Sequence, residues 1–130
     1  MTATHRTLLT AAVILLAACK NSTGPVAGTL KVNLTTPNSG FDGAAVIALT
    51  SPVPPTSVTP AAGLALWGGP VATTNARIVL TGTLSTGTIL TLQVDDVNKV
   101  GQYSVTVQQV AATTYQRRTS LTGYSVTVTK

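Results

Sequence analysis

The sequence predicts an all-β domain, built as a single sandwich of two packed antiparallel sheets. The chain is dominated by Thr, Val, Ala, Leu and Gly, with 8% charged and 4% aromatic residues. Thr and Val are β-branched and fit a pleated sheet better than a helix. Apolar and polar residues also alternate along several short segments, which are separated by stretches rich in Gly, Pro, Asn and Asp.

Seven segments are expected to form strands, with an eighth near Ser57–Thr59. In LKVNLTT (30–36) Leu30, Val32 and Leu34 alternate with polar residues, as in a strand with one buried face. GAAVIALT (43–50) is continuously apolar, which indicates a strand covered on both faces. The other five segments are GLALW (63–67), ARIVLTG (76–82), TILTLQV (88–94) and the two copies of YSVTV (103–107 and 124–128).

The proline-rich stretch Pro52–Pro60 is expected to lie in a loop or at a sheet edge, because proline cannot donate a hydrogen bond to a sheet ladder. We expect it to carry the chain from one sheet to the other. Several short strands at this turn spacing are typical of an immunoglobulin-like antiparallel sandwich of about 100 residues.

The two copies of YSVTV do not align outside the pentapeptide, so they indicate two half-buried strands rather than a repeat array. Their closeness in sequence predicts that they pair antiparallel. The connection between them is long for a hairpin, and long loops on a rigid sheet often carry function. It contains Tyr115, Arg117 and Arg118, which form the candidate binding loop. The alternative is a solvated loop in which Val110 and Leu121 tuck into the core.

The first nineteen residues, MTATHRTLLTAAVILLAAC, have the three parts of a secretory signal peptide. A short start containing His5 and Arg6 precedes the apolar run Leu8–Ala18, which ends in small residues. This run is far shorter than the roughly 20 residues that a membrane-spanning helix needs. It therefore predicts export rather than a stable transmembrane anchor.

The stretch Leu16–Cys19 (LAAC) resembles the lipobox of bacterial lipoproteins, and Cys19 is the only cysteine of the chain. The resemblance implies that Cys19 is acylated, binds membrane lipid and begins the mature protein. Lys20 stands where an aspartate would retain such a lipoprotein in the inner membrane, so the outer membrane of a two-membrane bacterium is expected. The alternative is an ordinary signal peptide with an incidental cysteine.

Three regions follow from these patterns. Residues 1–18 form the lipoprotein signal peptide, residues 19–28 the lipidated cysteine with a Gly-Pro-interrupted flexible tether, and residues 29–130 the sandwich domain.

The composition argues against catalysis. The one histidine, His5, lies in the signal peptide, and the chain has no glutamate. A His general base, a Ser-His-Asp triad and a Cys-His pair are therefore unavailable to the domain. Asp42 could formally pair with Asp95 or Asp96 as two acids across a sugar. Both sites lie in turn sequences, where aspartate usually bonds its own backbone, so we expect no enzyme activity and no catalytic residues.

No metal or other cofactor is expected either. Asp95, Asp96 and Asn98 could contribute oxygen ligands to a calcium ion, but their spacing matches no EF-hand loop and a turn is favoured. Trp67, the one tryptophan, is a candidate aromatic contact that could stack on a sugar. The alternative places it in the core or as a lid on the sheet edge.

The formal net charge is +5, from eight lysines and arginines against three aspartates. Its field favours anionic partners such as lipopolysaccharide, teichoic acid or anionic lipid. The cations are scattered along the chain without a basic run, and export also argues against nucleic acid as a partner.

The pattern is similar to the immunoglobulin-like, cohesin-like and carbohydrate-binding sandwiches of bacterial surface proteins. Together with the resemblance to a lipobox, this similarity implies a lipid-anchored cell-envelope lipoprotein that displays a non-catalytic binding module, with a glycan or an envelope protein as partner. The alternative is a structural accessory lipoprotein that docks to a larger envelope assembly, for instance by adding a strand to a sheet edge.

Overall fold

The computed structural model describes residues 24–68 and 73–130. In them the chain forms eight strands and one short 3-10 helix. The elements are β1 (Gly28–Thr35), β2 (Asp42–Thr50), β3 (Ser57–Pro60), β4 (Ala65–Trp67), β5 (Asn75–Leu84), β6 (Gly87–Val94), η1 (Val97–Gln102), β7 (Ser104–Ala112) and β8 (Ser125–Thr129).

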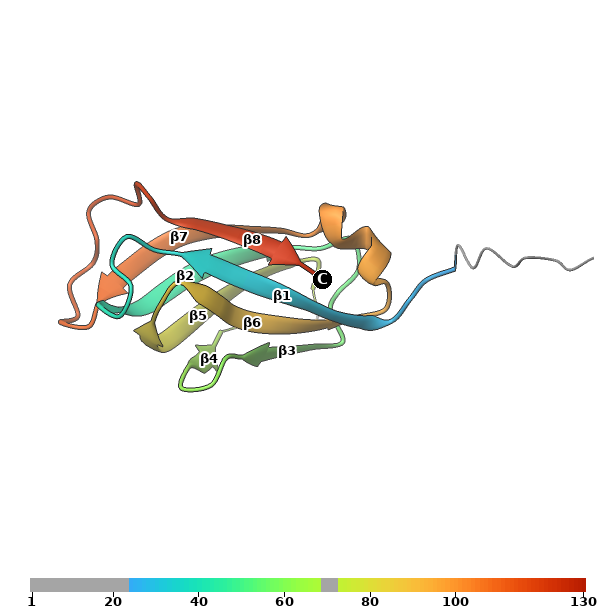
Figure 1. Ribbon diagram of the computed structural model, residues 1–130, viewed down its shortest axis with the longest axis horizontal. Helices are drawn as coiled ribbons and strands as arrows, with labels where there is room; N and C mark the ends of the chain where they lie inside the picture. Colours follow the sequence, from blue (N-terminus) through green and yellow to red (C-terminus); the bar gives the residue numbers. More distant parts are fainter. Residues whose placement is uncertain (1–23, 69–72) are drawn as a thin grey trace, which may run out of the picture.

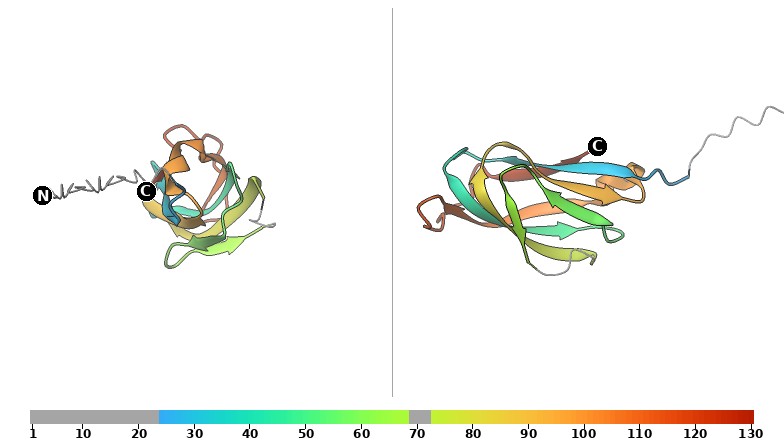
Figure 2. Two further views of the ribbon diagram at one scale, coloured as in Figure 1. Left: turned by 90° about the vertical axis from the view of Figure 1, so that its right-hand side faces the viewer. Right: turned by 90° about the horizontal axis from the view of Figure 1, so that it is seen from below.

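The strands form two four-stranded sheets that face each other (Figures 1 and 2). Sheet A has the order β3-β6-β1-β8 and sheet B the order β4-β5-β2-β7, with antiparallel pairing throughout. The predicted antiparallel sandwich is confirmed, and its architecture is compatible with an immunoglobulin-like fold. The short strand expected near Ser57–Thr59 is β3, at the edge of sheet A. The stretch Pro52–Pro60 leads from β2 in sheet B to β3 in sheet A, as predicted.

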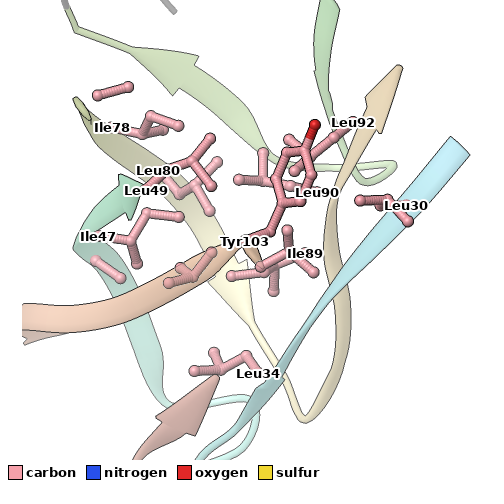
Figure 3. Packing of buried hydrophobic residues seen from close by; sticks show 14 of the residues in the cluster. Leu30, Leu34, Ile47, Leu49, Ile78, Leu80, Ile89, Leu90, Leu92 and Tyr103 are labelled. Atoms are coloured by element: carbon pink, nitrogen blue, oxygen red, sulfur yellow. The ribbon is translucent and has the colours of Figure 1, made fainter. Parts of the chain in front are cut away.

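The inner faces of the two sheets form the core. Leu30, Val32 and Leu34 of β1 are almost completely buried, as their alternation predicts. They belong to one buried cluster with residues of sheet B such as Ile47 and Ile78, and Figure 3 shows Leu30 and Leu34 on the side of β1 and Ile47 and Ile78 on the side of sheet B. Each fully buried Leu or Ile contributes about 1.5–3 kcal/mol relative to an exposed position. Because the chain has one cysteine, this burial holds the domain together without an internal disulfide.

The continuously apolar strand β2 differs from its prediction. Ala45, Ile47 and Leu49 are buried, but the alternating residues Ala44, Val46 and Ala48 are only half-buried. The strand is central in sheet B, yet its second face carries no further layer of the described chain. Its apolar character on both sides therefore reflects a partly exposed apolar surface rather than a strand covered on both faces.

Both copies of YSVTV form the predicted half-buried strands, as parts of β7 and β8, but the prediction that they pair with each other is wrong. The strand β7 pairs with β2 in sheet B, and β8 pairs with β1 in sheet A. Residues 116–118 turn back along β7 instead. The N–H of Ala112 donates to the carbonyl of Gln116 at 2.8 Å, and the N–H of Arg118 donates to the carbonyl of Val110 at 2.7 Å. Residues 116–118 therefore lie beside β7 at the edge of sheet B, where β8 was expected. The chain then crosses to sheet A.

The chain enters the sandwich at the end where η1 lies (Figure 1). The N–H of Val26 donates to Asp96 Oδ1 at 3.2 Å, and the N–H of Val97 donates to the carbonyl of Val26 at 2.8 Å. The expected tether 19–28 is therefore held to the domain from Val26 onward, and β1 begins at Gly28. The expected signal peptide 1–18 and Cys19 lie outside the described residues. Among the helices of the described chain, none has the length and hydropathy needed to span a membrane.

Candidate functional site

A buried carboxylate organises the end of the sandwich away from the N-terminal segment. Asp42, the first residue of β2, has no exposed surface. Its Oδ2 atom accepts hydrogen bonds from the hydroxyls of Thr36 at 2.6 Å and Tyr124 at 2.9 Å. Its Oδ1 atom forms an ion pair with Arg118 Nε at 2.9 Å. The hydrogen bond to Asp42 raises the pKa of Arg118 above its ordinary value, so the guanidinium stays charged.

This arrangement differs from the turn role expected for Asp42. The carboxylate joins the β1–β2 connection to the long β7–β8 connection, through partners up to 82 residues away. Asp95 and Asp96 lie at the other end of the sandwich, directly after β6 and beside Val26. The two acids that could formally face each other across a sugar are therefore separated by the length of the domain.

The two arginine side chains of the candidate binding loop point in different directions. Arg118 points to Asp42, and its Nη2 atom also donates to the carbonyl of Phe41 at 3.3 Å. Arg117 forms a bridge with Ala111 of β7 and lies on the outer side of sheet B, beside Val46 and Gln109. Adjacent residues of an extended chain point to opposite faces. The inward pairing of Arg118 thus directs Arg117 outward, and of these two arginines only Arg117 remains a candidate ligand contact.

Tyr115 occupies a strained position at the tip of the same hairpin. Its N–H donates to the carbonyl of Ala112 at 2.9 Å, which closes a β-turn from Ala112 to Tyr115 within the hairpin loop 113–115. Its φ is +67°, a left-handed conformation that usually takes Gly or Asn at this position of a three-residue hairpin loop. The side chain is 96% exposed. A bulky aromatic residue is therefore held in solvent at a conformational cost.

A hollow of about 390 Å³ lies next to Tyr115 on the outer side of sheet B. Its floor includes Gly43, Ala44 and Gly82, which present little or no side chain. The pairing of β2 with β5 shifts register between Asp42 and Ala44, which adds a residue to β5 at Gly82 and Thr83. Gly82 has φ +125°, and a Cβ atom there would lie 2.6 Å from the carbonyl oxygen of Gly63. The bulge therefore requires glycine at position 82, and the absence of a side chain at this position leaves the hollow open.

The hollow is one end of a larger surface, which we call the B face: the outward side chains of sheet B and of the adjoining residue 117, together with Tyr115 beside the hollow. Paired residues of neighbouring strands share a face, so the registers arrange these side chains in three rows across the sheet. The rows are Ala65–Thr81–Ala44–Ala111–Arg117, then Trp67–Val79–Val46–Gln109, then Arg77–Ala48–Thr106.

Trp67 forms one border of the B face. It lies on the edge strand β4 opposite Val79, and its side chain is 60% exposed. Its Nε1 atom donates to Thr81 Oγ1 at 2.8 Å, which fixes the indole against the sheet. The alternative that placed Trp67 in the core is wrong. Its other form, a position at the sheet edge, agrees with the place of Trp67 on the edge strand β4. The indole is available as an aromatic contact.

The outer side of sheet A has the opposite character. Its exposed positions carry Thr, Ser, Asn, Gln and Lys, and several of these bond to one another across strands. Asn33 donates to Thr129 Oγ1 at 3.1 Å and accepts from Thr88 at 2.7 Å, and Gln93 donates to Thr29 at 2.9 Å. Such paired polar groups offer few free bonds to a ligand. The two outer faces of the sandwich are therefore chemically distinct.

Asp95, Asp96 and Asn98 form a turn. Asp96 accepts the N–H of Asn98 at 3.0 Å and caps η1, and its backbone hydrogen bonds from Val26 and Asn98 lower its pKa. Asn98 Oδ1 accepts from Lys130 at 3.2 Å. Within residues 24–68 and 73–130 no group of three His, Cys, Asp or Glu side chains comes together as metal ligands do.

The B face can bind a ligand by stacking, apolar contact and hydrogen bonding. It offers the indole of Trp67, the ring of Tyr115 and polar ends from Thr81, Gln109 and Arg117. Sequence reasoning singled out three of these five but not Thr81 or Gln109. The alternation of β5 indicates which of its residues point outward, but it does not show which strands lie beside them.

Replacing Asp42 tests the buried network. Asp42→Asn removes the charge opposite Arg118 and places an amide among groups that donate hydrogen bonds, so we expect the free energy of unfolding to fall by about 2–4 kcal/mol. Denaturant unfolding measures this change. The matched control, Asp95→Asn at an exposed aspartate, should stay within about 0.5 kcal/mol of the parent protein. Equal effects of the two variants would contradict the structural role of Asp42.

Replacing Tyr115 tests the strain in the hairpin. Asn tolerates the left-handed conformation, so Tyr115→Asn should raise the free energy of unfolding, by up to about 1 kcal/mol. Thr114→Asn, one position earlier where φ is not positive, should give no such gain. Thermal unfolding of the two variants side by side decides the matter. A loss of stability in Tyr115→Asn would show that the ring contributes packing that outweighs its strain.

No protein-family model matches the chain, and comparisons with curated proteins and with solved structures found no match. The functional conclusion therefore rests on the chemistry of the B face.

Proposed function

We propose that the protein is a lipid-anchored envelope lipoprotein whose sandwich is a non-catalytic carbohydrate-binding module, with the B face as its contact surface. The observation that carries the proposal is the contrast between the two outer faces. Sheet A bonds its polar side chains to one another, whereas the outer side of sheet B has the exposed indole of Trp67 and half-buried alanine and valine side chains, with the exposed ring of Tyr115 beside it. Exposed apolar surface rimmed by polar groups is typical of a binding site.

The composition of the B face suits a sugar polymer. Between the hollow and Trp67, most of its floor consists of alanine methyl groups and the half-buried side chains of Val46 and Val79, with no large side chain among them. Protein interfaces usually concentrate their binding energy in large side chains that fill pockets. A sugar ring instead needs an aromatic or apolar surface for its C–H groups, together with hydrogen-bonding groups around it. Trp67 and Thr81 provide both at one border.

The placement of the B face is consistent with display from a membrane. Residues 24–27 leave the domain at one end, and the hairpin that carries Tyr115 lies at the opposite end (Figure 1). If Cys19 is acylated, the hollow beside Tyr115 is at the end of the domain away from the lipid. Two or more acyl chains make such an anchor stable, because each buried CH₂ contributes about 0.8 kcal/mol.

The second candidate function, docking to a larger envelope assembly, is favoured by one observation. The strand β8 lies at the edge of sheet A, and in the described part of the chain only β1 pairs with it. Charged side chains and proline usually protect an edge strand from the addition of another strand. Residues 125–129 contain neither. A partner could extend sheet A there.

Trp67 provides the test of carbohydrate binding. The full chain, purified in a non-ionic detergent, is incubated with cellulose, chitin, immobilised dextran and immobilised polygalacturonate, and the bound fraction is measured. We expect Trp67→Ala to weaken binding about tenfold, since a stacked aromatic ring contributes up to about 1.5 kcal/mol. Trp67→Phe retains a stacking ring and should keep most of the affinity.

Val53→Ala is the control for this test, because it removes an exposed apolar side chain from the proline-rich loop. It should bind as the parent protein does. Unchanged binding by Trp67→Ala, or failure of the parent to retain any polysaccharide, would contradict the proposed function.

Cys19 provides the test of lipidation. In a bacterial host the parent protein should fractionate with membranes and have the mass of residues 19–130 plus acyl chains. Cys19→Ala should give a soluble or unprocessed product without acyl mass, because the acylated thiol is lost. Normal processing and membrane association of the variant would rule out the lipoprotein assignment.

A further inference from the structure

We infer that the B face selects an acidic polysaccharide, whose carboxylates are bound by Arg117 and Arg77 at opposite corners of the face. This inference rests on the proposed function and specifies its ligand class. Arg117 ends the first row of the face and Arg77 begins the third, so the two guanidinium groups border an apolar area on a diagonal.

Both arginines are available to a ligand. Each is exposed, and neither side chain has a hydrogen-bond or ion-pair partner among residues 24–68 and 73–130. Arg118 shows the contrast, since its guanidinium is paired with Asp42 at 2.9 Å. The B face thus has two cations that the described fold does not use.

The same face has no acidic side chain. The chain has three acidic residues in total. Asp42 is buried and neutralised by Arg118, and Asp95 and Asp96 lie at the end of the domain where the N-terminal segment enters. The local charge of the B face is therefore purely positive, and its field attracts anions.

The geometry favours an extended ligand. Three strand spacings of about 4.8 Å and four residues at about 3.4 Å each separate the two arginines, which places their backbones about 20 Å apart. The line between them crosses the middle row at Val46 and Gln109. One small anion cannot reach both guanidinium groups at that separation. A polymer with repeated anionic groups can.

The chemistry favours carboxylates on sugar rings. Guanidinium forms two parallel hydrogen bonds with a carboxylate, a geometry that lysine cannot provide. Phosphate also accepts such bonds, but a polymer of simple phosphodiesters has no ring face to lie on the methyl groups between the two arginines or on the indole of Trp67. A polyuronate has both the carboxylates and the rings.

The experiment compares polygalacturonate with its fully methyl-esterified form, which has the same backbone without the charge. Dextran sulfate serves as a polyanion without carboxylates. With the full chain in non-ionic detergent, we expect polygalacturonate to bind at least tenfold more tightly than either of the other polymers. Equal binding of the methyl ester, or binding of dextran sulfate as tight as that of polygalacturonate, would overturn the inference.

Variants identify the residues responsible. Arg77→Gln and Arg117→Gln should each weaken polygalacturonate binding at least about tenfold, because each removes one charged guanidinium–carboxylate pair. Neither should change binding of the methyl ester. Arg117→Lys keeps the charge but not the two-bond geometry, so it should also lose several-fold. Full affinity of Arg117→Lys would show that the ligand needs only a positive charge at this position. That result would contradict the inference.

Lys31→Gln is the matched control, since it removes one positive charge from the outer side of sheet A. It should leave polygalacturonate binding unchanged, and a loss equal to that of Arg77→Gln would overturn the inference. Binding of neutral polysaccharides without any preference for polygalacturonate would overturn the inference alone. Failure to bind any polysaccharide would overturn the proposed function as well.

Discussion

The buried carboxylate of Asp42 is the interaction on which the functional end of the molecule depends. A fully buried charge is tolerated only when it is paired and hydrogen-bonded, and Asp42 is satisfied by Thr36, Tyr124 and Arg118. These partners come from the turn after β1, from the start of the β8 region and from the hairpin that follows β7. One side chain therefore fixes three segments, and with them the direction in which Arg117 leaves the hairpin.

The second constraint is the small size of the residues on the outer side of sheet B. Alanine and glycine at positions such as Ala44 and Gly82 keep the sheet surface bare, and the bulge at Gly82 opens the hollow beside Tyr115. Sheet A uses threonine and asparagine at equivalent outward positions and closes them with cross-strand hydrogen bonds. The inward positions of both sheets are mostly Leu, Ile and Val, with the smaller Ala45 and Ala76 in sheet B. The difference between the faces thus lies only in the outward residues.

Local alternation was enough to predict the strands of this fold. Leu30, Val32 and Leu34 mark the buried face of β1 without any knowledge of its neighbours, and the turn composition indicates where strands end. Sheet membership depends on contacts between distant segments, which a strand pattern does not contain. The identical pentapeptides show this clearly, because the same residues pair with β2 in one case and with β1 in the other. The continuous apolar run of β2 was ambiguous for the same reason.

The candidate site was predicted in part. Tyr115, Arg117 and Trp67 were identified because exposed aromatic and cationic side chains on loops or edges are common contacts, and the structure places all three around the B face. The structural role of Arg118 could not be predicted, since its partner Asp42 lies 76 residues earlier. The sequence around Asp42 indicates a turn, but it contains nothing that predicts the burial of this side chain or its three partners.

Amide hydrogen exchange of the hairpin in the free protein tests the central claim most directly. If Asp42 holds the hairpin rigidly, the N–H groups of Ala112 and Arg118, which donate to Gln116 and Val110, should exchange as slowly as amides in the centre of β2. Exchange of the Arg118 amide at the rate of an unstructured chain would show that the hairpin is not held. The surface that places Arg117 and Tyr115 beside the B face would then not be preformed.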